Sequence, residues 1–185
     1  MAIFGLIAEG KTDQIIIENI LVGYFNTDTI TINLLSPPRD KTGRYFDQNY
    51  TNWLKVFEYC QSSEFKDAFQ YNDYIIIQID TDVSEEKHYD IPKIENGIEL
   101  SPEQLIEKVV AKFKNLIGEA FYATHIDRII FAISVHSVEC WLLPLYYKDN
   151  KKSKIKNCLR ALNQALAKKE GFTIDAKDPE YYEII

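Results

Sequence analysis

The chain has 185 residues, of which 46% are hydrophobic and 26% are charged, a composition typical of one globular domain. This excludes a disordered or collagen-like chain, and no apolar run reaches the roughly 18 residues of a membrane-spanning helix. The net charge of −7 argues against a protein that coats nucleic acid by charge alone.

The cysteines also limit the possible function classes. Cys60, Cys140 and Cys158 are odd in number and share no Cys-x-x-Cys spacing, and with three scattered histidines they form no zinc module. We therefore expect free thiols, which suit a reducing cytosol. The N-terminus lacks the basic segment of a secretory signal, so the sequence predicts a cytoplasmic protein without a membrane partner.

The first elements alternate between strand and helix patterns. Residues 3–8 form a short apolar run that is typical of a buried strand, and a polar turn at 9–13 follows it. Apolar residues then recur at helical spacing over 16–24, with Thr12 or Asp13 as the candidate N-cap.

The middle of the chain continues this alternation. The β-branched run at 29–35 predicts a strand, and the segment from about 50 to 69 predicts a helix. The most strand-like run, at 74–79, ends in Asp80-Thr81-Asp82.

The remaining elements follow a polar, acidic excursion at 83–100, in which we expect no regular element. A serine cap followed by proline predicts a helix over 101–117 that stops at a glycine. Next come an apolar strand at 128–133, a short helix at 137–147 and a basic amphipathic helix at 151–169. Apolar strands that alternate with helices predict an α/β fold with a mostly parallel central sheet flanked by helices.

Acidic residues follow three of the predicted strands. Glu9 and Asp13 come after the first, Asp80 and Asp82 after the third, and Glu139 a few residues beyond the last. Because the carboxyl ends of strands line the ligand crevice of an open parallel sheet, these carboxylates converge if their strands are neighbours. Crowded carboxylates repel one another, and a divalent cation such as Mg²⁺ or Mn²⁺ removes that penalty.

Each acidic motif also has an ordinary structural explanation. Asp80 and Asp82 project to the same side of an extended chain, while Thr81 points away, but Asp is also common in turns that end strands. Asp13 favours a helix N-terminus for electrostatic reasons alone. Glu9 has no such explanation, since a carboxylate directly after a buried strand is costly unless it is used.

Two of these motifs together resemble a known family. An apolar strand ending in Glu-Gly-x-Thr-Asp at 9–13, with a later strand ending in Asp-x-Asp at 80–82, resembles the Toprim (topoisomerase–primase) domain. Residues 137–143, Ser-Val-Glu-Cys-Trp-Leu-Leu, resemble a Glu-x-Trp-Leu-Leu segment of small bacterial Toprim proteins akin to OLD-type nucleases. Several of those proteins belong to anti-phage defence systems and often lie beside an ATPase.

The resemblance covers about residues 1–147 and implies a Toprim-like Rossmannoid catalytic domain, with 83–100 as an excursion and 148–185 as a basic helical C-terminal extension. It implies a metal-dependent endonuclease that hydrolyses phosphodiester bonds of DNA or RNA and works with an ATPase partner in bacterial anti-phage defence.

The resemblance also assigns roles to the acidic residues. The implied catalytic residues are Glu9, Asp80 and Asp82. The implied ligands of Mg²⁺ or Mn²⁺ are the same three residues with Asp13 and Glu139. Metal ions at such a site activate water and stabilise charge on the phosphate and on the leaving oxygen.

Three other functions remain open. The run from Asp80 to Ser84 resembles the nucleophile motif of haloacid-dehalogenase-like phosphatases, although in that family the motif opens the domain. A glycosyltransferase with an Asp-x-Asp metal site would need a sugar-nucleotide domain in the 79 residues upstream. A non-catalytic Toprim subunit that only binds a partner is the third alternative.

Basic residues provide candidate contacts to nucleic acid. Residues 148–169 carry a local charge of +7, which leaves −14 for the remainder of the chain. The basic run comprises Lys148, Lys151, Lys152, Lys154, Lys156 and Arg160. Such a run is usually a solvated helix face, but a nuclease also needs positive surface to meet its substrate. We expect Lys151, Lys152 and Lys154 to bind nucleic acid.

Other polar side chains have two interpretations each. Lys11 could contact a phosphate beside Glu9 or be a solvated turn lysine, and we count it among the expected nucleic-acid contacts. His136 could shuttle protons or be a partly buried structural histidine. Arg39, Lys41 and Arg44 could clamp a phosphate or belong to an ordinary polar loop; these three residues lie outside those that the structure below describes.

Overall fold

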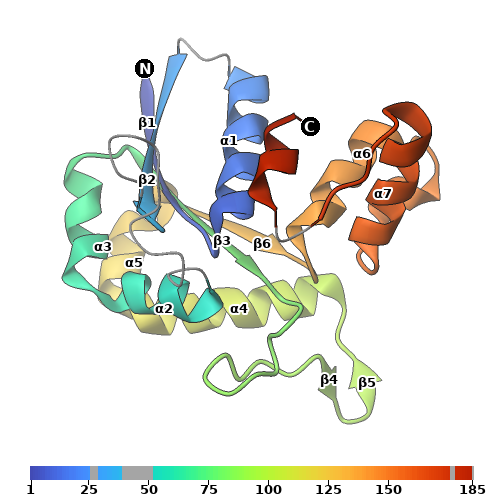
Figure 1. The fold of residues 1–185 in the computed structure, drawn as a ribbon. Helices are drawn as coiled ribbons and strands as arrows, with labels where there is room; N and C mark the ends of the chain where they lie inside the picture. The colour runs from blue at the N-terminus through green and yellow to red at the C-terminus, as the bar shows by residue number, and fades with distance from the viewer. Residues whose placement is uncertain (26–28, 39–51, 176–177, 185) are drawn as a thin grey trace.

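The computed structural model describes residues 1–25, 29–38, 52–175 and 178–184, and Figure 1 shows their arrangement. Within them, helices flank a four-stranded parallel sheet. This confirms the predicted α/β class with a parallel central sheet, and the arrangement is consistent with a Rossmann-like fold.

The strands follow the order β2-β1-β3-β6 across the sheet. Their bounds are Ala2–Ile7 for β1, Ile30–Ser36 for β2, Tyr74–Asp80 for β3 and Ile129–Ser134 for β6. Ile7 lies opposite Ile77, and Asp80 lies opposite Ser134. The strands β1, β3 and β6 are therefore direct neighbours that end at one edge of the sheet, as the convergence of their carboxylates requires.

One face of the sheet is covered by α1 (Lys11–Phe25), whose Ile17 packs in a buried cluster with Phe4. The helix begins earlier than predicted. Thr12 and Asp13 are therefore not its N-cap but lie in its first turn, where the Asp13 carboxylate still complements the helix dipole.

The C-terminal part of the chain extends this layer. Its elements are η4 (Val138–Leu142), α6 (Leu143–Tyr146), η5 (Asn150–Ser153), α7 (Cys158–Lys169) and η6 (Pro179–Ile184). Helix α7 shares a buried apolar cluster with η4 and with Ile15 and Ile16 of α1. The predicted extension thus packs on the first helix through a common core, and the predicted boundary at residue 147 stays a prediction.

Two helix predictions in this part are wrong in extent. Residues 137–147 form the 3-10 helix η4 and then the short helix α6, with Pro144 in its first turn rather than at its end. The helix predicted over 151–169 begins only at residue 158. The reason is that Asn157 adopts a left-handed backbone with φ of 56°, which an α-helix does not accommodate.

The opposite face of the sheet is covered by the elements between β2 and β6. They are α2 (Trp53–Gln61), α3 (Ser63–Asp67), η2 (Ala68–Gln70), α4 (Pro102–Ile117), α5 (Glu119–His125) and η3 (Ile126–Arg128). Buried residues of α2 and α4 pack in one cluster with Ile75, Ile77 and Ile79 of β3. In the described part of the chain, no helix has the length and apolar character to cross a bilayer.

The helix predicted over about 50–69 is divided, and residues 50–51 lie outside the described residues. Ser62 has an extended backbone and accepts a hydrogen bond from the Phe65 amide, so it ends α2 and caps α3. The start of α4 matches the prediction, because Ser101 and Gln104 form a reciprocal capping box. Helix α5 was not predicted.

The expectation of no regular element in 83–100 is wrong. The strands β4 (Ile94–Glu95) and β5 (Ile98–Glu99) pair as an antiparallel hairpin. Asn96 and Gly97 connect them with φ values of 52° and 77°, and this Asn-Gly pair is the sequence signal for such a hairpin. The segment is also anchored in the core, because Tyr89 is fully buried and packs against Phe57.

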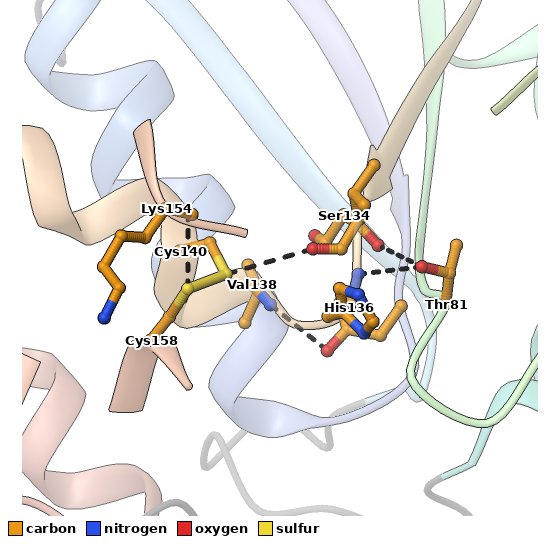
Figure 2. The surroundings of a disulfide bond; sticks show 9 residues. Thr81, Ser134, His136, Val138, Cys140, Lys154 and Cys158 are labelled. Atoms are coloured by element: carbon orange, nitrogen blue, oxygen red, sulfur yellow. Dashed lines mark hydrogen bonds between the residues drawn. A yellow bond between two sulfur atoms is a disulfide. The ribbon is translucent and has the colours of Figure 1, made fainter. Parts of the chain in front are cut away.

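The expectation of free thiols is wrong for two of the three cysteines. Cys140 of η4 and Cys158 of α7 form a disulfide, and their Cα atoms are 4.9 Å apart (Figure 2). The sequence gives no sign of this because the 18-residue separation is bridged only by tertiary packing. Closing a loop of this size stabilises a fold by about 3 kcal/mol. Cys60 is free and buried.

Two glycines test the packing of the sheet. A Cβ on Gly5 would lie 2.6 Å from Cδ1 of Leu35 and 2.7 Å from Cδ1 of the fully buried Ile75, so these side chains would have to shift. We expect Gly5→Ala to lower the free energy of unfolding by about 1–3 kcal/mol through overpacking. Gly23 lies exposed in α1 with open space around it, so Gly23→Ala is the matched control and should stabilise by up to about 1 kcal/mol. Urea denaturation measures both, and a Gly5→Ala variant as stable as the wild type would contradict the tight register.

Candidate functional site

The edge where β1, β3 and β6 end carries five acidic side chains, which we call the acidic cluster. Glu9 follows β1, Asp13 lies in the first turn of α1, Asp80 ends β3, Asp82 follows two residues later, and Glu139 lies in η4. Parallel pairing of the three strands brings these segments together although they are up to 130 residues apart in sequence. The structure thus places all five predicted acidic residues in one region.

Hydrogen bonds hold the strand ends in place. The Asp80 amide donates to Oε1 of Glu9 over 2.6 Å, and the Glu9 amide donates to Oε1 of Gln78 over 3.3 Å. Nε2 of Gln78 in turn donates to Oδ1 of Asp80 over 2.9 Å, and the Val138 amide donates to Oδ2 of Asp80 over 3.2 Å. Asp80 therefore connects all three segments of the site.

Thr81 fixes the chain between the two aspartates. It is buried, and its Oγ1 donates to the Ser134 carbonyl over 3.2 Å and accepts from the His136 amide over 2.8 Å (Figure 2). The His136 carbonyl accepts hydrogen bonds from the amides of Thr81 and Asp82. Thr81 therefore bonds to the end of β6, and Asp82 is left exposed.

The charges of the acidic cluster oppose one another. Burial and, to a smaller extent, the neighbouring Asp13 raise the pKa of Glu9 to about 8, against a hydrogen bond from the Asp80 amide that lowers it. Burial and the Glu139 carboxylate raise the pKa of Asp13 to about 7. Burial, together with Asp13 and Glu9, raises the pKa of Asp80 well above its ordinary value. Partial burial also raises the pKa of Asp82.

The chemistry of this donor set suits a divalent cation. Carboxylate oxygens are the ligands that Mg²⁺ and Mn²⁺ prefer, and a cation would offset the repulsion that, after burial, contributes to these raised pKa values. Within the described residues, however, no group of three His, Cys, Asp or Glu side chains is placed so that it could hold a metal ion. The carboxylates of Glu9 and Asp80 instead accept hydrogen bonds from backbone amides.

Tyr182 is a residue of the site that sequence reasoning missed. It is 1% exposed, and its hydroxyl donates to Oε1 of Glu139, itself 7% exposed, over 3.0 Å. Asn19 of α1 donates to the Tyr182 carbonyl and holds η6 against the helix. No pattern in the sequence connects a tyrosine near the C-terminus with Glu139, because the contact depends on how η6 packs.

The predicted basic residues are spread more widely. Lys11 is the first residue of α1 and is partly buried near the acidic cluster. Lys151 and Lys152 lie exposed in η5, and Lys154 is exposed just after it. Figure 2 shows the Lys154 side chain on the side of the disulfide away from His136.

Comparison with known proteins adds no family assignment, because the chain matches no protein-family model, no curated protein and no solved structure. What the site can do is therefore inferred from its own residues and their arrangement.

We expect the metal-free protein to lose stability as the pH rises. Glu9 and Asp13 ordinarily titrate at 4.5 and 3.8, but in the folded chain they hold their protons to about 8 and 7. Above pH 4 the folded state thus binds more protons than the unfolded state. The stabilisation that these protons provide is fully present below pH 4 and is lost as the pH rises to 7–8. Between its ordinary pKa and its raised pKa, each group lowers the free energy of unfolding by about 1.4 kcal/mol per pH unit.

Urea denaturation in the presence of a chelator, at pH 5 to 8, measures this slope. Glu9→Gln should flatten it, whereas Glu107→Gln, at an exposed position on α4, should leave it unchanged. A denaturation midpoint that stays constant or rises over this range would show that the cluster is not protonated as described.

The Tyr182–Glu139 contact should be visible as a coupling energy. Tyr182→Phe and Glu139→Ala each break the hydrogen bond, so their effects on the free energy of unfolding should be non-additive by about 1–3 kcal/mol. Tyr181→Phe, at the exposed neighbouring position, is the control and should be additive with Glu139→Ala. Additive effects of the Tyr182 pair would remove this residue from the site.

Proposed function

We propose that this chain is a divalent-cation-dependent nuclease that hydrolyses phosphodiester bonds in DNA or RNA. One observation carries the proposal: three neighbouring parallel strands lead into five carboxylates, and burial and mutual repulsion raise the pKa values of four of them. A protein gains nothing in stability from such crowding, so a functional ligand that relieves it is the simplest explanation.

The residues divide the chemistry between them. Asp80, Asp82, Asp13 and Glu139 supply the oxygen ligands for Mg²⁺ or Mn²⁺, and Asp80 is held by its three hydrogen-bonded neighbours. A bound cation supplies Lewis acidity that activates water and stabilises negative charge on the phosphate. Glu9 either binds the cation or, because its raised pKa keeps it largely protonated near neutral pH, donates a proton.

The Toprim resemblance supports a finer form of this proposal. It rests on the Glu-Gly-x-Thr-Asp and Asp-x-Asp motifs and on the segment around Glu139. On that basis we propose a Toprim-type endonuclease that acts in bacterial anti-phage defence with an ATPase partner.

The phosphatase alternative is less well supported by the geometry. It would require Asp80 to attack phosphorus, yet both carboxylate oxygens of Asp80 already accept hydrogen bonds, from Gln78 and from the Val138 amide. Asp80 is more naturally a fixed ligand than a nucleophile. Hydrolysis of p-nitrophenyl phosphate, a monoester, is a direct check on this alternative.

The nuclease proposal predicts cation-dependent cleavage. The purified protein with Mg²⁺ or Mn²⁺ should cleave at least one of single-stranded DNA, double-stranded DNA and RNA, each carrying a fluorescent label. Glu9→Gln and Asp80→Asn should each lower the rate by on the order of 10²–10⁴-fold. Glu107→Gln removes an equal charge from an exposed surface and should not change the rate.

Two outcomes would contradict this assignment. Cleavage that persists in both variants, or in the presence of a chelator, would mean that the acidic cluster is not the site. Cation binding by calorimetry without any cleavage, alone or with an ATPase partner, would favour the non-catalytic subunit.

A further inference from the structure

A small, largely apolar groove lies near the acidic cluster. It is lined by Lys93 and Glu99 from the 83–100 segment, by His136 from the turn after β6, and by the apolar residues Leu100, Pro102, Leu105, Val135 and Ile155. Three parts of the chain that are distant in sequence thus meet at this groove. We call it the lysine groove and define it by Lys93, His136 and the neighbouring Lys156.

Lys93 connects the groove to the acidic cluster. Its Nζ donates a hydrogen bond to the Asp82 carbonyl, and its amide donates to Oε1 of Glu85. The ammonium group therefore lies beside one of the proposed cation ligands and is held there by two contacts. The segment 83–100, like the basic C-terminal extension, has no counterpart in the Toprim resemblance, so Lys93 lies outside that resemblance.

Lys156 reaches the hairpin from the basic segment. Its Nζ forms an ion pair with Glu99 of β5, which joins the hairpin to the basic segment. Glu95 of β4 pairs with Lys108 of α4 over 2.7 Å, so the hairpin is held on both sides. Both Lys93 and Lys156 lie near enough to His136 to lower its pKa, although burial is the larger cause.

His136 sits at the boundary between the groove and the acidic cluster. Its φ of 69° is rare for a non-glycine residue, and its backbone is fixed by hydrogen bonds with Thr81 and Asp82. Strained backbone of this kind persists where the surrounding structure holds it in place, and it is frequent at functional sites. Here it places the imidazole near both lysines.

We propose that the lysine groove binds the backbone phosphate next to the one that is hydrolysed. This inference rests on the proposed nuclease function and specifies its substrate as a chain of at least two phosphodiesters, rather than an isolated diester. The physical reason is charge: the acidic cluster repels a polyanion, and lysine ammonium groups bind phosphate as point charges. A flanking phosphate bound in the groove would position the adjacent phosphodiester bond at the cation site.

The test compares two substrates. With a labelled oligonucleotide, Lys93→Ala and Lys156→Ala should raise KM and leave kcat nearly unchanged. With bis(p-nitrophenyl) phosphate, a diester without a flanking phosphate, both variants should react like the wild type. Lys168→Ala, which removes the same charge from the exposed far end of α7, should change neither reaction. Lys93→Arg should retain binding, and thermal denaturation checks that each variant is folded.

Binding without cleavage provides a second readout. Fluorescence anisotropy measures binding of the labelled oligonucleotide in the presence of a chelator. Each substitution of a groove lysine should reduce the slope of the logarithm of the binding constant against the logarithm of salt concentration by about 1. Glu99→Gln releases Lys156 from its ion pair and should tighten binding. The corresponding changes at Lys151, Lys152 and Lys154 should have smaller effects, since the groove is lined by Lys93 and His136 and not by these side chains.

Each result decides the proposal. If the wild type does not bind the oligonucleotide, or if Lys93→Ala and Lys156→Ala leave both slope and KM unchanged, the groove does not bind phosphate, even where cleavage confirms the nuclease. If losses at Lys151, Lys152 and Lys154 equal those at the groove, the basic surface acts diffusely and the proposal is wrong. Groove-dependent binding without any cleavage would support the groove and overturn the nuclease function.

Discussion

Parallel pairing of β1 with β3 and of β3 with β6 is the constraint on which the site depends. It forces the carboxyl ends of three strands to one edge of the sheet, and all three continue into segments that carry acids. Strand register alone brings Glu9 and Asp80 within hydrogen-bond distance. Because the strands are buried on both faces, a shift in register would displace the core as well as the site.

The rest of the fold compensates for this concentration of charge. Backbone amides of Asp80 and Val138 donate to carboxylates, Tyr182 donates to Glu139, and protons remain on groups with raised pKa. These contacts come from β3, η4 and η6, so the arrangement of the acids involves distant parts of the chain. The disulfide attaches η4 to α7 directly next to Glu139 and so couples the C-terminal layer to the site.

The sequence predicted what depends on local pattern. The apolar runs located all four strands of the sheet to within one residue, and the Ser101 capping box located the start of α4. Acidic residues after three strands indicated where the site lies, because neighbouring parallel strands end at the same edge of the sheet. Contacts between segments distant in sequence could not be predicted. The Cys140–Cys158 disulfide and the hydrogen bond between Tyr182 and Glu139 arise from tertiary packing and have no local sequence pattern. The β4–β5 hairpin, by contrast, had its Asn-Gly signal and was overlooked.

The overall charge of −7 and a polyanionic substrate are compatible once the charges are placed in space. The acids concentrate at the sheet edge, where a bound cation would neutralise them, and Lys93 and Lys156 come from two different segments near the groove. Lys93 belongs to a segment whose composition is acidic, so no count of charges along the chain identifies it. Its contact with the Asp82 carbonyl places the ammonium group beside a proposed cation ligand. Under the proposed function, position relative to the acidic cluster, rather than local charge density, would determine which lysines contribute to phosphate binding.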